Sequence, residues 1–254
     1  MFLLLIYTFL YIFYQKKNMT YIWCTCIIPF YNEKDGVINV IKKLADIQQF
    51  NEIILVNDWS KDNSLALVEN FIDSNKYTHI KCISYTENKG KSHAIHQGVK
   101  ATKTEYVFMF DSDIKEIKTE EIVYTIKHMY KYPKIDMGIL RRTRAKWYIK
   151  ILYRELILSG QRMLRTKDLE EIFTQSVEKY QLEVAINTFM EKRKKTVVRY
   201  PFSGENSCKS EKRGIINGRK KDLFMFKDIF KYQGILGYIK HSFFFSPINE
   251  KKYK

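Results

Sequence analysis

Two carboxylates one residue apart, Asp111 and Asp113, directly follow an apolar run at residues 106–110. Neighbouring carboxylates repel each other unless a positive charge lies between them, and hard divalent cations prefer oxygen ligands of this kind. The pair therefore suggests a metal site that binds a diphosphate. A turn at the end of a strand is the alternative interpretation, because Asp and Ser are common turn residues.

The run before the carboxylates, YVFMF, holds five apolar residues without alternation. Such a run is typical of a strand that is buried on both faces, as in a parallel sheet. The C-terminal end of a strand of this kind faces the crevice in which open α/β sheets bind ligands. Asp111 and Asp113 are therefore expected at the mouth of the sheet.

Similar apolar runs alternate with helix-periodic stretches over about 110 residues, which predicts an α/β fold with a parallel or mostly parallel sheet. Strands are expected at residues 21–28, 52–56, 80–85 and 106–110, the first of them ended by Pro29, and helices at residues 35–47, 64–72 and 92–102. Acidic or amide residues follow each strand, namely Asn32, Glu33, Asn57, Asp58, Asn88, Asp111 and Asp113. Because these positions line the crevice of a doubly wound sheet, together they predict a nucleotide site closed by a metal.

Four ordered segments resemble the family-2 glycosyltransferases of GT-A fold over roughly residues 20–115. They are PFYNE at 29–33, VNDWSKD at 56–62, NKGK at 88–91 with Ala94 and Gly98, and DSD at 111–113. Segments at 159–162, 180–187 and 204–209 are similar to the dolichyl-phosphate and polyprenyl-phosphate sugar transferase branch. The resemblance implies the Rossmann-like nucleotide-diphospho-sugar transferase fold, with a mostly parallel sheet flanked by helices.

The resemblance also implies which residues hold the nucleotide part of a UDP-sugar or GDP-sugar donor. The backbone around Pro29 and Tyr31, together with Glu33, would hold the base and the ribose. Asp58 stands where the family has its nucleotide-contacting aspartate, and Lys91 lies in the glycine-turn segment that approaches the nucleotide.

For the reacting groups, the resemblance implies that Asp111 contacts the ribose or sugar side and that Asp113 binds a divalent metal, Mg²⁺ or Mn²⁺; both aspartates are metal-ligand candidates. Transfer would proceed with inversion. A hydroxyl acceptor needs a general base, for which Glu183 is the candidate, whereas a phosphate acceptor needs none and a solvated helix residue is the alternative for Glu183. Arg162 is the catalytic-site arginine candidate, in a group that could pair with phosphates and also contains Arg141, Arg142, Arg144 and Arg165.

Trp59 departs from the family pattern, because it stands where the family has a turn glycine. A left-handed conformation would cost tryptophan about 1 kcal/mol or more. Either the turn differs here, or the codon comes from a genome that reads a stop codon as glycine.

The formal net charge of +16 indicates an anionic partner, which could be nucleic acid, anionic lipid or a phosphorylated substrate. Half of this excess lies in residues 191–221, which hold eleven Lys and Arg against three Glu. A solvated basic face is the alternative. Four cysteines without zinc-ligand spacing predict free, buried thiols, with Cys24 and Cys26 on the same face of a strand.

Three parts of the chain are expected: an apolar N-terminal segment at 1–18, a catalytic domain at 19–218 and a basic, aromatic and amphipathic segment at 219–254. The first segment could be a membrane-dipping anchor, a short signal-anchor or an upstream extension before Met19. The last resembles an interfacial helix, and packing against the catalytic domain is the alternative. These features predict a protein at the cytoplasmic face of the membrane, held peripherally or by its N-terminus.

The sequence therefore predicts a metal-dependent, inverting glycosyltransferase that acts on a lipid-phosphate or glycan acceptor. A nucleotidyltransferase is the first alternative, although residues 29–33 replace the Gly-rich loop expected after its first strand. A non-enzymatic protein that binds nucleic acid or another anionic surface is the second. No nucleic-acid-binding motif is recognisable, so nucleic acid is not the expected partner.

Overall fold

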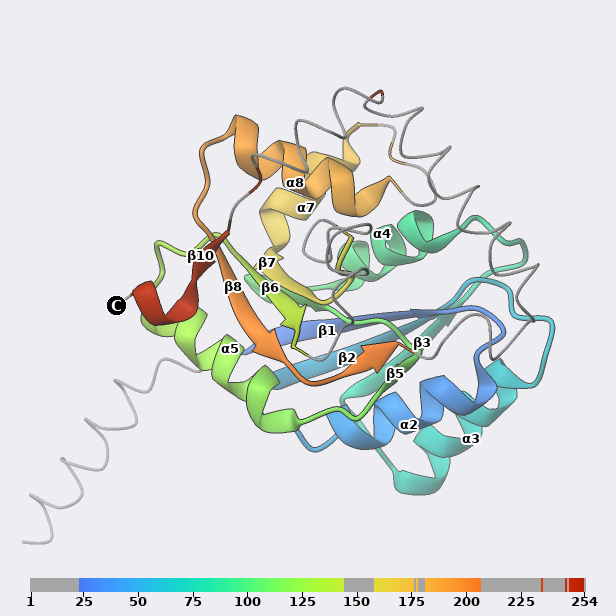
Figure 1. The fold of residues 1–254 in the computed structure, drawn as a ribbon. Helices are drawn as coiled ribbons and strands as arrows, with labels where there is room; N and C mark the ends of the chain where they lie inside the picture. The colour runs from blue at the N-terminus through green and yellow to red at the C-terminus, as the bar shows by residue number, and fades with distance from the viewer. Residues whose placement is uncertain are drawn as a thin grey trace, which may run out of the picture.

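The computed structural model describes residues 23–143, 158–175, 177, 181–206, 234, 245 and 247–253. In this part of the chain, helices cover both faces of a mixed sheet, which gives three layers (Figure 1). The strands of the main sheet are β1 (Cys24–Phe30), β2 (Phe50–Asn57), β3 (Ile80–Ser84), β4 (Tyr106–Met109), β6 (Met137–Arg142), β7 (Arg162–Arg165), β8 (Val197–Phe202) and β10 (Ile248–Asn249). The helices are α2 (Lys34–Leu44), α3 (Ser64–Asn75), α4 (Lys91–Ala101), α5 (Thr119–Lys131), α7 (Thr166–Phe173) and α8 (Leu182–Lys192), with a 3₁₀ turn, η1 (Glu250–Lys252).

The described sheet has eight strands in the order β10-β8-β6-β7-β4-β1-β2-β3. Every pairing is parallel except those of β7, which runs antiparallel between β4 and β6. A second, two-stranded sheet joins β5 (Ile114–Lys115) to β9 (Glu205–Asn206). The mostly parallel α/β sheet expected from the sequence is therefore confirmed.

Two apolar clusters, one on each face, hold the layers together. Helices α2, α3 and α5 pack on one face, and α4, α7 and α8 pack on the other (Figure 1). Burial of both faces explains why the predicted strands read as continuous apolar runs. Cys24 and Cys26 lie in the first cluster as free, buried thiols, as predicted.

The predicted strands and helices of the first half all form, with boundaries that shift by a few residues. The first strand differs more, because β1 continues through Pro29 to Phe30. Its pairing with β4 ends at Ile27 and Met109, and Phe110 N donates to Ile27 O just beyond. Since successive peptide groups point to alternate sides of a strand, position 29 faces the β4 side after that pairing has ended. The missing N–H of Pro29 therefore removes no ladder bond.

The turn after β2 does take the left-handed conformation at Trp59, whose φ is 59°. Trp59 is 38% exposed, and Lys61 Nζ lies 2.9 Å from the centroid of its indole ring. The cation–π contact contributes about 0.5–1 kcal/mol at an exposed site, which is less than the cost of the left-handed backbone.

Replacing Trp59 with glycine is therefore expected to raise the free energy of unfolding by about 0.5–1 kcal/mol, as measured by urea denaturation. Lys76 is a matched control, because its φ is 54° and no aromatic contact would be lost. If Lys76→Gly stabilises the protein and Trp59→Gly destabilises it, the indole contacts outweigh the backbone strain.

The end of the chain joins the same sheet, since β10 pairs in parallel with β8. None of the helices in the described residues combines the length and apolar character needed to cross a membrane. The predictions for residues 1–18, for Arg144 and for most of residues 207–244 fall outside the described part of the chain.

Candidate functional site

The predicted site residues lie along one edge of the sheet, at the C-terminal ends of its parallel strands. Tyr31 and Glu33 follow β1, Asp58 follows β2, and Lys91 begins the helix after β3. Asp111 and Asp113 follow β4, while Arg162 begins β7 and Glu183 lies in the first turn of α8. The topology therefore brings together residues that are up to about 150 positions apart in the sequence.

Lys91 joins two carboxylates from distant parts of the chain. Its Nζ lies 2.7 Å from Asp111 Oδ1 and 2.7 Å from Glu183 Oε1. Burial disfavours the charged form of Lys91, but the two carboxylates outweigh this effect and raise its pKa. A lysine at the first position of a helix opposes the helix dipole, so these two carboxylates also compensate for its place in α4.

Asp111 is held in its ionised form by its neighbours. Burial alone would raise its pKa, but the charge and hydrogen bond of Lys91, the hydrogen bond of Gln161 and the charge of Arg142 together lower it. Gln161 Nε2 donates to Asp111 Oδ2 at 2.6 Å. Lys91 lies on one oxygen of Asp111 and Gln161 on the other, so the carboxylate is fixed within the protein. The role of Asp111 as a metal ligand stays a prediction.

The antiparallel direction of β7 brings the segment before it to the site. Met109 pairs with Arg162, so an extension of the register by two residues places Gly160 opposite Asp111. A Cβ on Gly160 would lie 2.5 Å and 2.6 Å from the Asp111 carboxylate oxygens and 2.7 Å from Lys91 Nζ. Only glycine leaves room at this position for the ion pair.

Arg162 is fully buried and supports the site through contacts with neighbouring segments. Its Nε donates to Ser159 O at 2.6 Å, and its Nη1 donates to Glu183 O at 3.2 Å and to Asn187 Oδ1 at 2.5 Å. Burial lowers its pKa to about 10, so the guanidinium stays charged at neutral pH. These contacts make Arg162 a positioning residue for the start of α8, which corrects its predicted role in binding phosphate.

Glu183 is not a solvated helix residue, because its side chain is only 8% exposed. It is fixed twice, through its carboxylate by Lys91 and through its backbone carbonyl by Arg162. Lys91 Nζ contacts both Glu183 Oε1 and Asp111 Oδ1. The two carboxylates therefore face each other across one shared ammonium group.

Asp58 organises the loop that delivers Lys91. Its carboxylate accepts hydrogen bonds from Tyr85 Oη at 2.8 Å and Asn88 Nδ2 at 2.9 Å, and from the backbone N–H groups of Lys89 at 2.8 Å and Gly90 at 2.9 Å. Both oxygens are thus used within the protein, and Asp58 is only 4% exposed. In this arrangement Asp58 shapes the residues directly before α4.

Replacing Asp58 with asparagine is expected to lower the free energy of unfolding by about 2 kcal/mol, because an amide cannot accept on both sides and leaves a buried N–H unpaired. Urea denaturation measures the loss. Asp46→Asn, at an exposed loop position, is the control and should change stability by less than about 0.5 kcal/mol. Equal stability of the two variants would contradict the role given to Asp58.

Asp113 lies between two anchored elements. Asp111 precedes it by two residues, and β5, which pairs with β9, begins at the next residue. Within the described residues, no three His, Cys, Asp or Glu side chains form a group that could hold a metal by themselves. Magnesium commonly uses one or two carboxylates together with substrate phosphates and water, so a single carboxylate at this edge fits a metal that binds together with a diphosphate.

The residues after β1 form the outer part of this edge. Tyr31 is 38% exposed, whereas Pro29 lies within the buried strand. Glu33 packs against the first turn of α2, where a Cβ on Gly36 would lie 2.6 Å from Glu33 Oε1 and 2.7 Å from Ser112 O. Glu33 is therefore beside the Asp111–Asp113 segment, and Tyr31 is accessible to a ligand.

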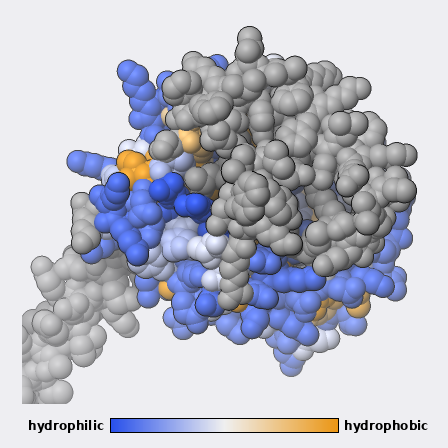
Figure 2. Space-filling model, in the orientation of Figure 1, coloured by the Kyte–Doolittle hydropathy of each residue, from blue (hydrophilic) through white to orange (hydrophobic). Residues whose placement is uncertain are grey.

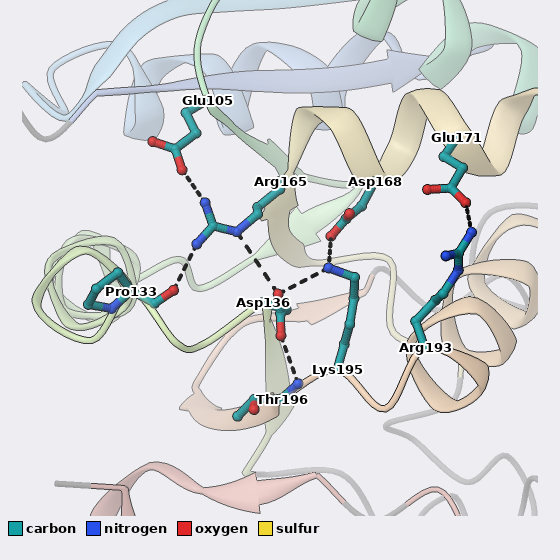
Figure 3. A network of polar contacts seen from close by, with 9 residues as sticks. All are labelled: Glu105, Pro133, Asp136, Arg165, Asp168, Glu171, Arg193, Lys195 and Thr196. Atoms are coloured by element: carbon teal, nitrogen blue, oxygen red, sulfur yellow. Dashed lines mark hydrogen bonds and ion pairs between the residues drawn. The ribbon is translucent and has the colours of Figure 1, made fainter.

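Several basic residues that the charge pattern singled out are engaged in ion pairs away from this edge (Figure 3). Arg165 contacts Glu105 and donates to Pro133 O, and Lys195 lies 3.1 Å from both Asp136 and Asp168. Arg165 is at the far end of β7, so the strand carries it away from Asp111. Arg165 is thus not part of the phosphate-binding group to which the sequence assigned it.

Three residues that contact the predicted ones had no assigned role. Gln161 fixes Asp111, Tyr85 fixes Asp58 and Asn187 fixes Arg162. Gln161 and Asn187 lie in the segments of looser resemblance, which was the available signal. Their roles depend on the direction of β7 and on the docking of α8, which no local pattern reveals.

Comparisons with known proteins agree with this architecture. The chain is 30% identical over 141 residues, 52% of its length, to the dolichyl-phosphate β-glucosyltransferase of Dictyostelium discoideum, and covers 42% of that protein. It is 28% identical over 112 residues, 44% of its length, to the poly-β-1,6-N-acetyl-D-glucosamine synthase of Staphylococcus aureus (strain MSSA476), of which it covers 26%. The chain thus spans less than half the length of these relatives.

The fold is similar to that of glucosyl-3-phosphoglycerate synthase from Mycobacterium tuberculosis in complex with phosphoglyceric acid, with a TM-score of 0.60 at 14% identity. The alignment covers 82% of this chain and 80% of that one. This similarity confirms the predicted GT-A fold. The model of the family described as "Glycosyl transferase family 2" matches residues 25–206, more than half of the chain and all of the site described above. The resemblance inferred from the four ordered motifs is therefore confirmed, and the chain belongs to glycosyl transferase family 2.

Proposed function

We propose that this protein is a metal-dependent, inverting glycosyltransferase that moves a sugar from a nucleotide-sugar to a lipid-phosphate or glycan acceptor. Family membership supports this activity and favours neither a nucleotidyltransferase nor a nucleic-acid-binding protein. The names of the two relatives described above indicate transfer to dolichyl phosphate and synthesis of a polysaccharide. Solved neighbours of the same fold hold UDP with Mn²⁺ or Mg²⁺.

The observation that carries the proposal is the bridge from Asp111 through Lys91 to Glu183 at the carboxyl edge of the sheet. It places one fixed positive charge between two carboxylates. Asp113 follows one of them, Asp111, by two residues. Departure of a nucleoside diphosphate leaves negative charge on its phosphates, and a cation held at this edge stabilises that charge.

Asp113 is the residue proposed to hold the divalent metal, because the oxygens of Asp111 are occupied by Lys91 and Gln161. When bound, the metal supplies positive charge for the diphosphate and orients it. Asp111 keeps Lys91 in place and faces the sugar side, and exposed Tyr31 is available to the base of the nucleotide.

Of these two acceptor classes, we favour the phosphate group over the hydroxyl of a glycan. A hydroxyl acceptor needs a base that is free to take its proton. Glu183 Oε1 accepts a hydrogen bond from Lys91 at 2.7 Å and the side chain is largely buried, so it is better suited to fixing the lysine. A phosphate acceptor is already anionic. We place this reaction at the cytoplasmic face of the membrane, with the protein bound peripherally or through residues 1–18.

Replacing Asp113 with alanine is expected to weaken metal-dependent nucleotide binding by at least about tenfold, because a metal ligand is removed while the Lys91 bridge remains. Calorimetric titration of UDP and GDP, each with and without Mn²⁺, measures this and also identifies the donor nucleotide. Asp46→Ala, at an exposed position, is the matched control. Absence of binding by the unaltered protein under every metal condition would overturn the proposed function.

A further inference from the structure

A pocket of ≈ 330 Å³ lies where the ends of β6 and β8 meet β10 and η1. Four of its charged lining residues are basic and one is acidic. The lining residues that matter here are Arg141, Arg142, Arg199, Asn249, Glu250 and Lys251. We propose that this pocket, whose Arg142 also acts on Asp111, binds a phosphate group.

The strand register places three of these residues, Arg141, Arg199 and Asn249, on one face of the sheet. Arg199 pairs with Ile139 of β6 on one side and with Asn249 of β10 on the other. Arg141 is two residues beyond Ile139, so its side chain points to the same face as those of Arg199 and Asn249. The C-terminal strand is therefore what completes this polar surface.

On the same face of the sheet, the residues two positions earlier in β6 and β8 are apolar. Ile139 and Val197 belong to the cluster under α7 and α8, and two residues further along each strand stand Arg141 and Arg199. In Figure 2, the surface near the place where Figure 1 shows β10 is largely hydrophilic, with a hydrophobic patch beside it. The change from apolar to basic marks the point at which the strands leave the core.

Arg199 gives an independent indication of a missing ligand. Its Nε is buried and meets no hydrogen-bond partner among the described residues. A buried donor on a charged group is costly unless an acceptor reaches it. The one carboxylate of the lining, Glu250, is itself only 6% exposed and leaves the basic residues in excess.

The ligand chemistry follows from these groups. Guanidinium groups bind phosphate through pairs of parallel hydrogen bonds, and lysine adds a mobile positive charge. The volume is enough for a phosphate and the first atoms attached to it. The phosphate could belong to a lipid or to a soluble molecule, and binding to this pocket does not depend on the proposed sugar transfer.

The test compares the full chain with Arg199→Gln, Lys251→Ala and the control Lys43→Ala, which removes an exposed lysine from α2. One arm titrates inorganic phosphate and pyrophosphate by calorimetry. The other measures sedimentation with phosphatidylcholine vesicles that contain undecaprenyl phosphate, against vesicles of phosphatidylcholine alone. Binding of UDP with Mn²⁺ is followed in every variant as a measure of intact folding at the other site.

We expect Arg199→Gln and Lys251→Ala each to weaken phosphate binding by about tenfold or more, with Lys43→Ala unchanged. If the same two variants also lose vesicle binding, the phosphate is that of a lipid; if only the soluble anions are affected, it is that of a soluble molecule. Phosphate and vesicle binding that are absent, or equal in all four proteins, would overturn the proposal. Unchanged UDP binding in the two variants separates this outcome from a failure of folding or of the proposed function.

Discussion

Replacing Lys91 with methionine is expected to reduce sugar transfer by at least about 100-fold and to lower the free energy of unfolding by about 3 kcal/mol. Methionine keeps much of the side-chain length but removes the ammonium that Asp111 and Glu183 share at 2.7 Å each. Two carboxylates would then face each other with no cation between them. The loss is set at the lower end of the range for buried pairs because the lysine side chain is 26% exposed.

The pH dependence of stability distinguishes this cause from a simple loss of packing. In the unaltered protein the pKa of Asp111 lies below its usual value of 3.8, so its contribution to stability is present above that value and is lost only as the pH falls further. Without Lys91, burial raises the pKa of Asp111. Its contribution is then present at low pH and is lost as the pH rises.

Relative to that of the unaltered protein, the free energy of unfolding of Lys91→Met should therefore increase between pH 7 and pH 5. Urea denaturation at several pH values measures both. Lys89→Met is the matched control, since its salt bridge with Glu87 is exposed to solvent and should contribute little to stability. A loss of stability in Lys91→Met that is the same at pH 5 and pH 7 would show that the shared cation is not its cause.

Replacing Arg162 with methionine is expected to lower the free energy of unfolding by about 3–5 kcal/mol, the largest effect on stability predicted here. The guanidinium is fully buried and satisfies Ser159 O, Glu183 O and Asn187 Oδ1. Methionine would fill part of the volume but would leave these acceptors without a donor. Since one of them belongs to Glu183, the start of α8 should also move relative to Lys91.

Arg165 provides a control on the same strand. It pairs with Glu105, whose side chain is 60% exposed, and donates to Pro133 O, so Arg165→Met should cost about 1–2 kcal/mol, less than Arg162→Met. Urea denaturation compares the two variants, and Asn187→Ala should reproduce part of the Arg162 effect. If Arg162→Met retained full stability while sugar transfer was lost, Arg162 would contact the substrate, as the sequence suggested, rather than position α8.

The order of elements could be predicted because it depends on local patterns. Continuous apolar runs such as residues 106–110 identify strands buried on both faces, and parallel strands place their C-terminal ends at one edge. This reasoning was enough to assign Asp58, Asp111 and Asp113 to one crevice, and the family resemblance added Lys91. The ordered motifs around them were enough to predict the family.

Only the tertiary structure decided what each of these side chains contacts. A sequence does not reveal that β7 runs antiparallel, and this direction is what sets Gly160 and Gln161 against Asp111. It is also the docking of α8 that turns Glu183 toward Lys91 and makes Arg162 a buried support. Strand direction and helix docking depend on contacts between residues far apart in the chain, whereas apolar periodicity depends on near neighbours. The sequence alone therefore determined which residues reach the carboxyl edge of the sheet, and the packing of β7 and α8 determined how they pair there.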